Sequence, residues 1–387
     1  MTTYLGSKPV GINTIRVVEK QVVSDEWQPN PNWWDIKKIL NEDTRDYAGK
    51  VGVILYNFND VSDFQLSSSG MTAVATSDGA FYTYADNGAN VSHNWDTSKD
   101  KDDGRGFKTR WVIYYYTTDT TGDTFGQSST KFGWEYNYIA YLVLRINCTN
   151  GTNFCASHQL LEGIDNVGYA ISGTAFNSFC SYCHSLQKLP DVMDTSSATS
   201  FNSFCTYCYS LKSLTETLDT SSCTNISYFC NGCYSLQTLP DVLDTSRVTI
   251  FNSFCAYCAS LRKMPDVLDT SSGTSFGGFC YQCSSLQTAP PITMVSNAAD
   301  ITAAHQSVFI VCRWLENVFI TLPSNTGLWL NSSTRISIES FRYIADHAPD
   351  VTATPRTLTI GSTNITRCNE ADPTIITDLN AKGWTVA

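Results

Sequence analysis

The chain has 387 residues, of which 42% are hydrophobic and 16% are charged, with a formal net charge of -11 and a pI near 4.8. This composition predicts a folded chain with polar surfaces, and the length allows two or three units with separate cores. An acidic chain without clustered Lys and Arg argues against nucleic acid as a partner, because phosphate binding depends on such clusters. No run of about 18 apolar residues is present, so we expect no membrane insertion.

The N-terminal residues contain no basic segment followed by an apolar stretch, so we expect no secretory signal. Residues 1–22 predict a short strand pair around Lys8-Pro9 and Gly11. This opening resembles the N-termini of tailed-phage fibre and tip proteins. The resemblance implies an anchoring segment that contacts other virion tail proteins.

Residues 23–150 alternate strand-like runs with turns rich in Gly, Asp, Asn and Ser. Asn32 is a candidate cap for a short helix through Leu40. The predicted strands are Val51–Phe58, Met71–Thr76, Ala80–Tyr84, Thr109–Thr117 and Tyr138–Ile146. Such a series predicts an antiparallel β-sandwich. Thr76–Thr83 and His93–Thr117 are similar to a β-domain of phage and prophage tail proteins.

Residues 151–293 contain five consecutive units with a period of 25 residues. The first cysteines of these units are Cys180, Cys205, Cys230, Cys255 and Cys280. A degenerate unit precedes them, with His158 at the second cysteine position and the other register positions filled by Phe154, Cys155, Leu161 and Ile164. A fixed period of this length indicates a stacked array, whose end units differ because they must cap the core.

Each unit is predicted to contain one short helix, one short strand and two turns. The inner face of the helix is predicted from three- and four-residue steps between Phe201, Phe204, Cys205, Cys208, Leu211 and Leu214. Leu-Pro-Asp-Val-Leu predicts a strand, and Asp-Thr-Ser predicts a turn in which side-chain oxygens bond the backbone. The expected fold class is α+β, with the β-sandwich followed by a leucine-rich-repeat-type solenoid and a C-terminal cap.

One known family shares part of this pattern. The shared positions are Phe229-Cys230, Cys233, Ser235-Leu236, Leu239-Pro240-Asp241 and Leu243-Asp244-Thr245-Ser246. With them the repeat resembles the BspA-type leucine-rich repeat of bacterial surface antigens. The cysteine beside the phenylalanine departs from the family pattern and creates a CxxC pair. The resemblance implies a protein that binds host proteins or surfaces and has no catalytic site.

The five CxxC pairs raise the alternative of structural zinc, which needs four ligands that converge from separate pairs. Each pair falls instead on the predicted apolar side of its unit, among Phe and Leu positions. Buried cysteine behaves as a small hydrophobe, so we expect a ladder of core thiols and no metal or cofactor. The acidic run Asp100–Gly104 lacks the spacing of a calcium loop, and we expect a solvated turn there.

Residues 294–387 continue the pattern less regularly. The repeat spacing recurs after an insertion at Cys312, Leu315 and Val318. Ser337–His347 predicts an amphipathic helix whose inward residues are Ile338, Phe341, Ile344 and Ala345. The ending predicts a strand at Thr357–Ile360 and a helix near Asp372–Lys382, with Gly383 as its stop. It resembles the C-terminal cap of leucine-rich fibre proteins of gut phages and their hosts.

We find no sequence feature of an enzyme. No HExxH or GxSxG context surrounds any of the five histidines, which are His93, His158, His184, His305 and His347. A pair of catalytic carboxylates needs no fixed spacing, so a glycan-degrading tail enzyme is kept as a weaker alternative. The aspartates that recur in register are predicted to form turns.

Positions that vary between units mark the solvent face, because the core positions are nearly fixed. One such column is His184, Tyr209, Tyr234, Ala259 and Ser284, and the adjacent one is Gln187, Lys212, Gln237, Arg262 and Gln287. Aromatic and Arg side chains supply interface energy at low entropic cost. We therefore predict ligand binding by His184, Tyr209, Tyr234, Gln187, Lys212, Gln237 and Arg262, with ordinary solvated positions as the alternative.

Together these features predict a non-enzymatic virion structural protein. We expect a tail fibre or receptor-binding protein of a tailed phage, which attaches the particle to a protein or glycan receptor on the host. By analogy with phage fibres we expect a homotrimer. The alternative is a bacterial cell-surface adhesin with BspA-type repeats.

Overall fold

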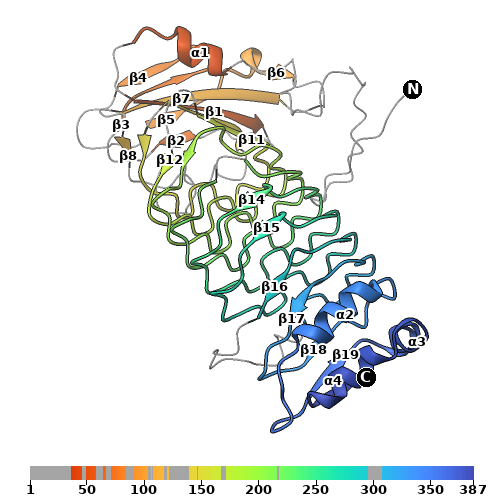
Figure 1. The fold of residues 1–387 in the computed structure, drawn as a ribbon. Helices are drawn as coiled ribbons and strands as arrows, with labels where there is room; N and C mark the ends of the chain where they lie inside the picture. The colour runs from red at the N-terminus through yellow and green to blue at the C-terminus, as the bar shows by residue number, and fades with distance from the viewer. Residues whose placement is uncertain are drawn as a thin grey trace. The chain divides into compact units, whose positions relative to one another are not determined.

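The computed structural model describes residues 36–45, 49–57, 64–66, 71–83, 91–102, 106, 108–116, 120–121, 139–145, 147–166, 171–215, 218–294 and 307–387. The chain divides into two compact units. Figure 1 labels the helices and strands along the chain. Unit 1 comprises Met1–Thr195 with Cys208–Ser210, and unit 2 comprises Ser196–Tyr207 with Leu211–Ala387. Each unit is described by itself. The predicted segment 1–22 lies outside the described residues.

The main sheet of unit 1 has seven strands in the order β11-β9-β1-β7-β3-β4, with β6 pairing β7. All of these neighbours are antiparallel except β11, which runs parallel to β9. The strands are β1 (Gly49–Asn57), β3 (Met71–Thr76), β4 (Phe81–Thr83), β6 (Lys101–Asp102), β7 (Lys108–Tyr116), β9 (Ile139–Arg145) and β11 (Gly163–Asn166).

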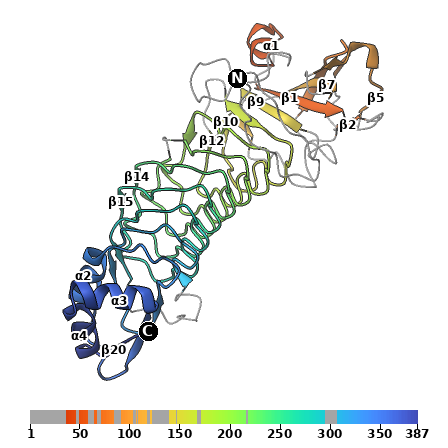
Figure 2. The ribbon, with the colours of Figure 1, turned by 90° about the vertical axis from the view of Figure 1, so that its right-hand side faces the viewer.

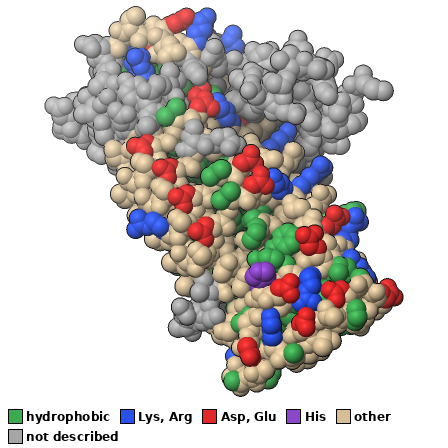
Figure 3. Space-filling model, viewed as in Figure 1, with side chains coloured by type: hydrophobic (Ala, Val, Ile, Leu, Met, Phe, Trp, Pro, Cys, Tyr) green, Lys and Arg blue, Asp and Glu red, His purple; other side chains and the backbone are tan. Residues whose placement is uncertain are grey.

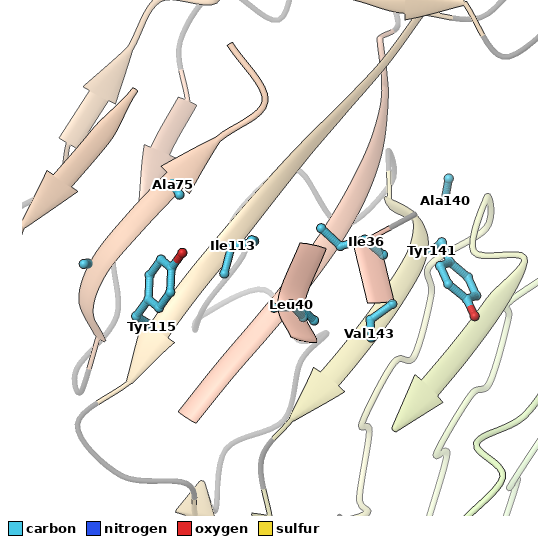
Figure 4. Close-up of a cluster of buried hydrophobic side chains, with 9 residues drawn as sticks. Ile36, Leu40, Ala75, Ile113, Tyr115, Ala140, Tyr141 and Val143 are labelled. Atoms are coloured by element: carbon cyan, nitrogen blue, oxygen red, sulfur yellow. The ribbon is translucent and has the colours of Figure 1, made fainter. Parts of the chain in front are cut away.

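One helix, α1 (Ile36–Glu42), covers a face of this sheet. Ile36 and Leu40 are buried against side chains of β3, β7 and β9, among them Ile113 and Val143 (Figure 4). The helix approaches β1 closely because the sheet has a glycine there. A Cβ at Gly52 would lie 2.6 Å from Cγ1 of Ile36.

The predicted β-sandwich is wrong, although its strands were located to within one or two residues. These strands pair edge to edge into a single sheet, and α1 provides part of the apolar cover that a second sheet would have supplied. Strand β11 comes from the predicted degenerate repeat and extends the sheet at β9. In the acidic run, Asp102 is exposed as expected, whereas the Asp100 side chain is only 7% exposed and pairs with Arg110 at 2.7 Å; residues 103–105 lie outside the described residues.

Two smaller sheets complete unit 1. The order β13-β12-β10-β8 forms a short parallel stack, and β2 pairs with β5 in antiparallel register. These strands and the 3-10 helix η1 are β2 (Phe64–Leu66), β5 (Val91–His93), η1 (Thr97–Lys99), β8 (Thr120–Thr121), β10 (Asn147–Cys148), β12 (Ile171–Ser172) and β13 (Met193–Asp194).

The repeats contain no helix within the described residues of 171–294. In unit 2, alternate N–H groups donate to the following repeat, from Phe201, Ser203, Cys205 and Tyr207 to the carbonyls of Asn225, Ser227, Phe229 and Asn231 at 2.9, 2.8, 2.8 and 2.7 Å. Residues between them donate three positions back, as Phe204 does to Phe201 at 3.1 Å. An α-helix would bond every N–H four residues back. The segment is therefore a chain of tight turns joined to its neighbours (Figure 2).

Left-handed residues explain why no helix forms. Two positions of the repeat have positive φ. In the unit that begins at Phe201 they are Ser203 and Tyr207, both at 59°. A residue in this region ends a right-handed helix. The predicted leucine-rich-repeat solenoid, built of a helix and a strand per coil, is thus not what the structure shows, and the expected fold class is wrong.

The burial predicted for the repeats is confirmed. The Phe, Cys and Leu positions predicted for the unit that begins at Phe201 are all buried. The rings of Phe204, Phe229, Phe254 and Phe279 stack with centroids of neighbouring rings 5.3 to 5.5 Å apart. Parallel bridges such as Ser200 to Asn225 and Asn225 to Ile250 keep the repeats of unit 2 in register. The three-residue steps are real, but they arise from turns rather than from a helix.

The strands and turns described for the repeats follow the prediction more closely. Val242 pairs with Val267, and Leu243 with Leu268, in the two-residue strands β14 (Val242–Leu243) and β15 (Val267–Leu268). In the turn of the preceding repeat, Asp219 Oδ1 accepts from the backbone of Ser221 at 2.9 Å, and the Thr220 hydroxyl donates to Asp244 O at 2.8 Å. The turn-forming role predicted for these aspartates is confirmed.

The C-terminal part of unit 2 combines short strands with three helices. Helix α2 begins after Ser337, whose hydroxyl caps the Ser340 N–H at 3.1 Å, and buries Phe341, Ile344 and Ala345 as predicted, while Ile338 is only half-buried. Gly383 stops α4 with φ 85°. The elements are β16 (Ile292–Thr293), β17 (Ile320–Thr321), β18 (Leu328–Trp329), α2 (Ile338–His347), β19 (Arg356–Thr359), α3 (Ser362–Ala371), α4 (Thr374–Ala381) and β20 (Trp384–Val386).

Helix α3 was not predicted. Its buried Asn364 donates to Ser333 O at 2.7 Å and to Ile360 O at 3.0 Å, so a polar side chain holds a position where periodicity would look for an apolar one. The boundaries expected at 22, 150 and 293 stay predictions. Of the helices that the structure describes, none has the length and apolar character needed to span a membrane.

Candidate functional site

The repeat cysteines lie in the core and are sealed from solvent. All 15 cysteines are unbridged and buried. In unit 2 the thiol at the second cysteine position donates to the carbonyl of the first cysteine in the preceding repeat, from Cys233, Cys258, Cys283 and Cys312 to Cys205, Cys230, Cys255 and Cys280 at 3.0, 3.1, 2.9 and 3.0 Å. Burial raises the pKa of the Cys230, Cys255 and Cys280 thiols well above its ordinary range. Neutral thiols of this kind are packing residues.

His158 takes the second cysteine position of the degenerate unit, as predicted. Its ring is buried in unit 1, and Nδ1–H donates to the carbonyls of Cys155 and Ala156 at 3.1 and 3.2 Å. Burial lowers the pKa of His158 to about 4. The imidazole is therefore neutral at pH 7 and replaces a thiol as an uncharged core donor.

The first predicted column divides between the two units. In unit 1, His184 and Tyr209 stack with ring centroids 4.4 Å apart and an interplanar angle of 12°. Both are half-buried, and both ring nitrogens of His184 are shielded from solvent without a hydrogen-bond partner, which departs from the exposed position expected. Burial lowers the pKa of His184. In unit 2, Tyr234 is 42% exposed, in agreement with the expectation.

The second predicted column is solvent-accessible. Lys212, Gln237 and Arg262 are exposed in unit 2, and Gln187 is half-buried in unit 1. The backbone on either side of these residues is bound to the next repeat, with Gln237 N–H donating to Lys212 O at 2.8 Å and Gln287 N–H donating to Arg262 O at 2.9 Å. These side chains therefore project from a backbone held on both sides.

Gln237 and Arg262 also line a surface depression in unit 2. The depression has a volume of about 440 Å³ and is lined by Gln237, Thr238, Ser260, Arg262, Lys263 and Ser285. Ser260 N–H donates to Tyr234 O at 3.2 Å, which places the Tyr234 backbone next to the lining. Every lining side chain can donate a hydrogen bond. The depression suits a polar ligand.

The two cations that line the depression, Lys263 and Arg262, differ in whether they pair with a carboxylate. Lys263 Nζ lies 2.5 Å from Asp266 Oδ1, and this contact raises the pKa of Lys263. Arg262 forms no ion pair with any carboxylate of the described residues. Acidic side chains are scattered over the repeats on the face seen in Figure 3, and Asp241, Asp244 and Asp266 are exposed. The Arg262 guanidinium is thus a cation without a carboxylate partner among the described residues.

Three exposed tyrosines were missed by the sequence interpretation. Tyr182, Tyr228 and Tyr257 are 47%, 43% and 36% exposed, and all three have positive φ. They fall inside or beside the CxxC segments, which were assigned to helix. The available signal was the variation of these two positions between Tyr, Ser, Gly and Gln, the residue types seen at 178, 203, 228, 253 and 278 and at 182, 207, 232, 257 and 282.

Unit 1 contains a buried polar network that resembles acid–base machinery. His93 Nε2 lies 2.9 Å from Asp78 Oδ2, and the Tyr82 hydroxyl lies 2.6 Å from His93 Nδ1. The His93 and Asp78 side chains are only 6% and 5% exposed, and Trp95 packs edge-on against the imidazole at 4.9 Å. These bonds join strand β4 and the turn at Asp78 to strand β5 within unit 1.

Among the residues that the structure describes, no group of three or more His, Cys, Asp or Glu side chains is arranged to hold a metal ion. No protein-family model matches the chain, and comparison with curated proteins and with solved structures finds no match.

Proposed function

We propose that this protein is a non-enzymatic attachment protein, and that unit 2 carries the binding surface at the depression around Gln237 and Arg262. The observation that carries the proposal is that two residues chosen by their variation between repeats line one hollow of about 440 Å³. Ligand sites of proteins fall at about 300–1,000 Å³. Variable polar side chains on a repeated, hydrogen-bonded backbone are a common design for recognition surfaces.

We further propose that the protein belongs to a virion, as a tail fibre or receptor-binding protein that attaches a tailed phage to its host. Support comes from the likeness of residues 1–22 and of His93–Thr117 to phage tail proteins. In this proposal the N-terminal region contacts other tail proteins, the chain assembles as a homotrimer, and the repeats meet a protein or glycan receptor. Light scattering at micromolar concentration tests the trimer, and a monomer would contradict it.

The experiment is particle adsorption to host cells with the variant Tyr209→Ala, Tyr234→Ala, Arg262→Glu. We expect adsorption to fall at least tenfold while the variant stays folded, because Tyr234 and Arg262 project into solvent. A small loss of thermal stability is expected from Tyr209→Ala, since Tyr209 is half-buried and stacks on His184. The matched control is Arg247→Glu, which reverses an equally exposed cation outside the depression lining. Unchanged adsorption by the folded triple variant would refute this site.

The second candidate is a bacterial cell-surface adhesin, and the BspA-like repeat pattern favours it. In this case the same depression binds the ligand, but the protein lies on a bacterial cell surface instead of a phage particle. Detection of the chain in purified virions by mass spectrometry supports the phage protein, and detection on intact bacterial cells supports the adhesin. Release of reducing ends from host surface polysaccharide would instead indicate the glycan-degrading enzyme, which we do not propose.

A further inference from the structure

The depression around Arg262 is lined by two cations, Arg262 and Lys263, on a chain whose net charge is negative. The whole chain carries a net charge of -11, and Asp241 and Asp266 lie close enough to Lys263 to influence its pKa. Lys263 is therefore largely compensated by its neighbours, whereas Arg262 has no carboxylate partner among the described residues. One uncompensated guanidinium is the local electrostatic feature that a ligand would meet.

The polar groups of the lining suit a ligand that carries hydroxyl or carboxyl groups. Thr238, Ser260 and Ser285 offer hydroxyls, Gln237 offers an amide, and Arg262 and Lys263 offer N–H donors. Hydroxyls and the amide can both donate and accept, which is what the hydroxyl groups of a sugar require. Tyr234 is 42% exposed and its carbonyl accepts from the Ser260 N–H, so its backbone adjoins the lining, although its ring is not part of the lining.

The electrostatics also disfavour a dense polyanion. Salt screens charges that lie beyond about 8–10 Å, so a phosphate polymer or nucleic acid needs many cations close to it, whereas the depression is lined by two, Arg262 and Lys263. A single carboxylate is different, because a guanidinium binds it through two parallel N–H···O bonds at short range. One acidic group among several hydroxyls matches one free guanidinium among several neutral donors.

From this arrangement we propose that the depression binds an acidic carbohydrate, with the Arg262 guanidinium holding a sugar carboxylate and the neutral side chains holding its hydroxyls. The inference rests on the proposed attachment function and specifies its ligand class. The site is preorganised, because the backbone at Gln237 and Arg262 is fixed by bonds to Lys212 and Gln287 at 2.8 and 2.9 Å. Binding then requires little ordering of the main chain, and the ordering that remains is that of the exposed Gln237 and Arg262 side chains.

The test is an array of oligosaccharides in which each uronate- or sialate-containing member is paired with its carboxyl-reduced form, probed with the full chain. We expect acidic members to bind at least tenfold more tightly than their reduced partners, which corresponds to about 1.4 kcal/mol. Arg262→Gln should remove that preference without changing binding to the reduced forms. Arg262→Lys should restore only part of it, because an ammonium lacks the planar fork.

Arg247→Gln is the matched control, since it removes an exposed arginine that does not line the depression. Equal binding of the acidic and reduced members, a preference for phosphorylated members, or an equal loss with Arg247→Gln would overturn the inference. So would binding to no acidic member of the array. If the triple variant loses adsorption while the array shows no preference for acidic members, the proposed attachment site is kept and only the proposed ligand class is refuted. If adsorption is unchanged in that variant, the proposed function fails at this site.

Discussion

The main sheet of unit 1 and the repeats of unit 2 solve the burial of polar groups in opposite ways. The sheet keeps ionised side chains in its interior, where Arg110 binds Asp100 through two bonds of 2.7 and 3.0 Å and Lys50 lies 3.3 Å from Asp43. Among the described residues of 211–294, the buried side chains include none with a formal charge. Breaking a buried ion pair leaves one charge without a partner, so the sheet depends on pairs that the repeats do not need.

The repeats rely on identical neutral layers instead. Phenylalanine rings stack at 5.3 to 5.5 Å, thiols donate to carbonyls, and alternate backbone N–H groups bind the next repeat. Each layer satisfies the polar groups of its neighbour, and no single side chain carries a large electrostatic share. The comparison teaches that one region is sensitive to the loss of a partner and the other to the loss of volume.

The sharpest test of this contrast lies in one hairpin of unit 1. Arg110→Ala should destabilise unit 1 by about 3–5 kcal/mol, because Asp100 stays buried without its cation. Lys108→Ala removes the exposed pair with Asp102, whose side chains are 52% and 53% exposed, and should cost less than about 1 kcal/mol. Urea unfolding followed by tryptophan fluorescence measures both, and equal losses would contradict the assigned role of burial.

The corresponding test in the repeats removes volume. Phe229→Ala should cost about 3–5 kcal/mol, because the ring is fully buried between Phe204 and Phe254. The neighbouring Tyr228, which is 43% exposed, provides the control, and Tyr228→Ala should change stability by less than about 0.5 kcal/mol. A large effect of Tyr228→Ala in thermal unfolding would mean that the exposed rings carry packing energy.

A pH titration separates the two regions further. His158 has a folded pKa of about 4 against 6.5 in the unfolded chain, so the unfolded state binds the proton first as the pH falls. The contribution of neutral His158 to the free energy of unfolding is therefore fully present above pH 6.5. It is lost between pH 6.5 and 4 and amounts to about 3 kcal/mol. His158→Gln should remove this slope in urea unfolding at pH 7 and 4.5. If the variant loses as much unfolding free energy between pH 7 and 4.5 as the wild type, His158 is not the cause of the pH dependence.

Carboxylates act in a lower window. Hydrogen bonds from Ser221 and Ser246 hold the pKa of Asp219 and Asp244 below the ordinary 3.8, so these groups lose their native contacts only as the pH falls below that value. The two windows therefore do not overlap, and a loss of stability above pH 4 cannot be assigned to the turn aspartates.

The smallest effect is expected from the thiol ladder. Cys205→Ser should destabilise by about 1–3 kcal/mol, because a hydroxyl is costlier to bury than a thiol. In the native protein the repeat thiols should resist alkylation at pH 8 and should all react after unfolding, since burial both shields them and raises their pKa. Rapid alkylation of a native repeat cysteine would show that the ladder opens readily.

The sequence by itself determined which side chains of the repeats are buried, because a 25-residue period repeats the same Phe, Cys and Leu positions in every layer. It also located strands such as Met71–Thr76 and the helix that begins after Ser337, where alternation and a capping serine act locally. Gln237 and Arg262 could be chosen as candidate site residues because variation marks exposure. That they share one hollow with Ser260 and Ser285 could not be predicted.

Tertiary structure alone decided the backbone path of the repeats. Phe and Cys at three- and four-residue steps suit a helix and a chain of tight turns equally, and bonds to the next repeat selected the turns with left-handed Ser203 and Tyr207. Likewise, the strands of unit 1 could have formed two sheets, but Gly52 let Ile36 of α1 approach one sheet closely, and β11 joined its edge. The local sequence pattern specifies which side chains are buried. Residues distant in the sequence decide which partners those side chains pack against.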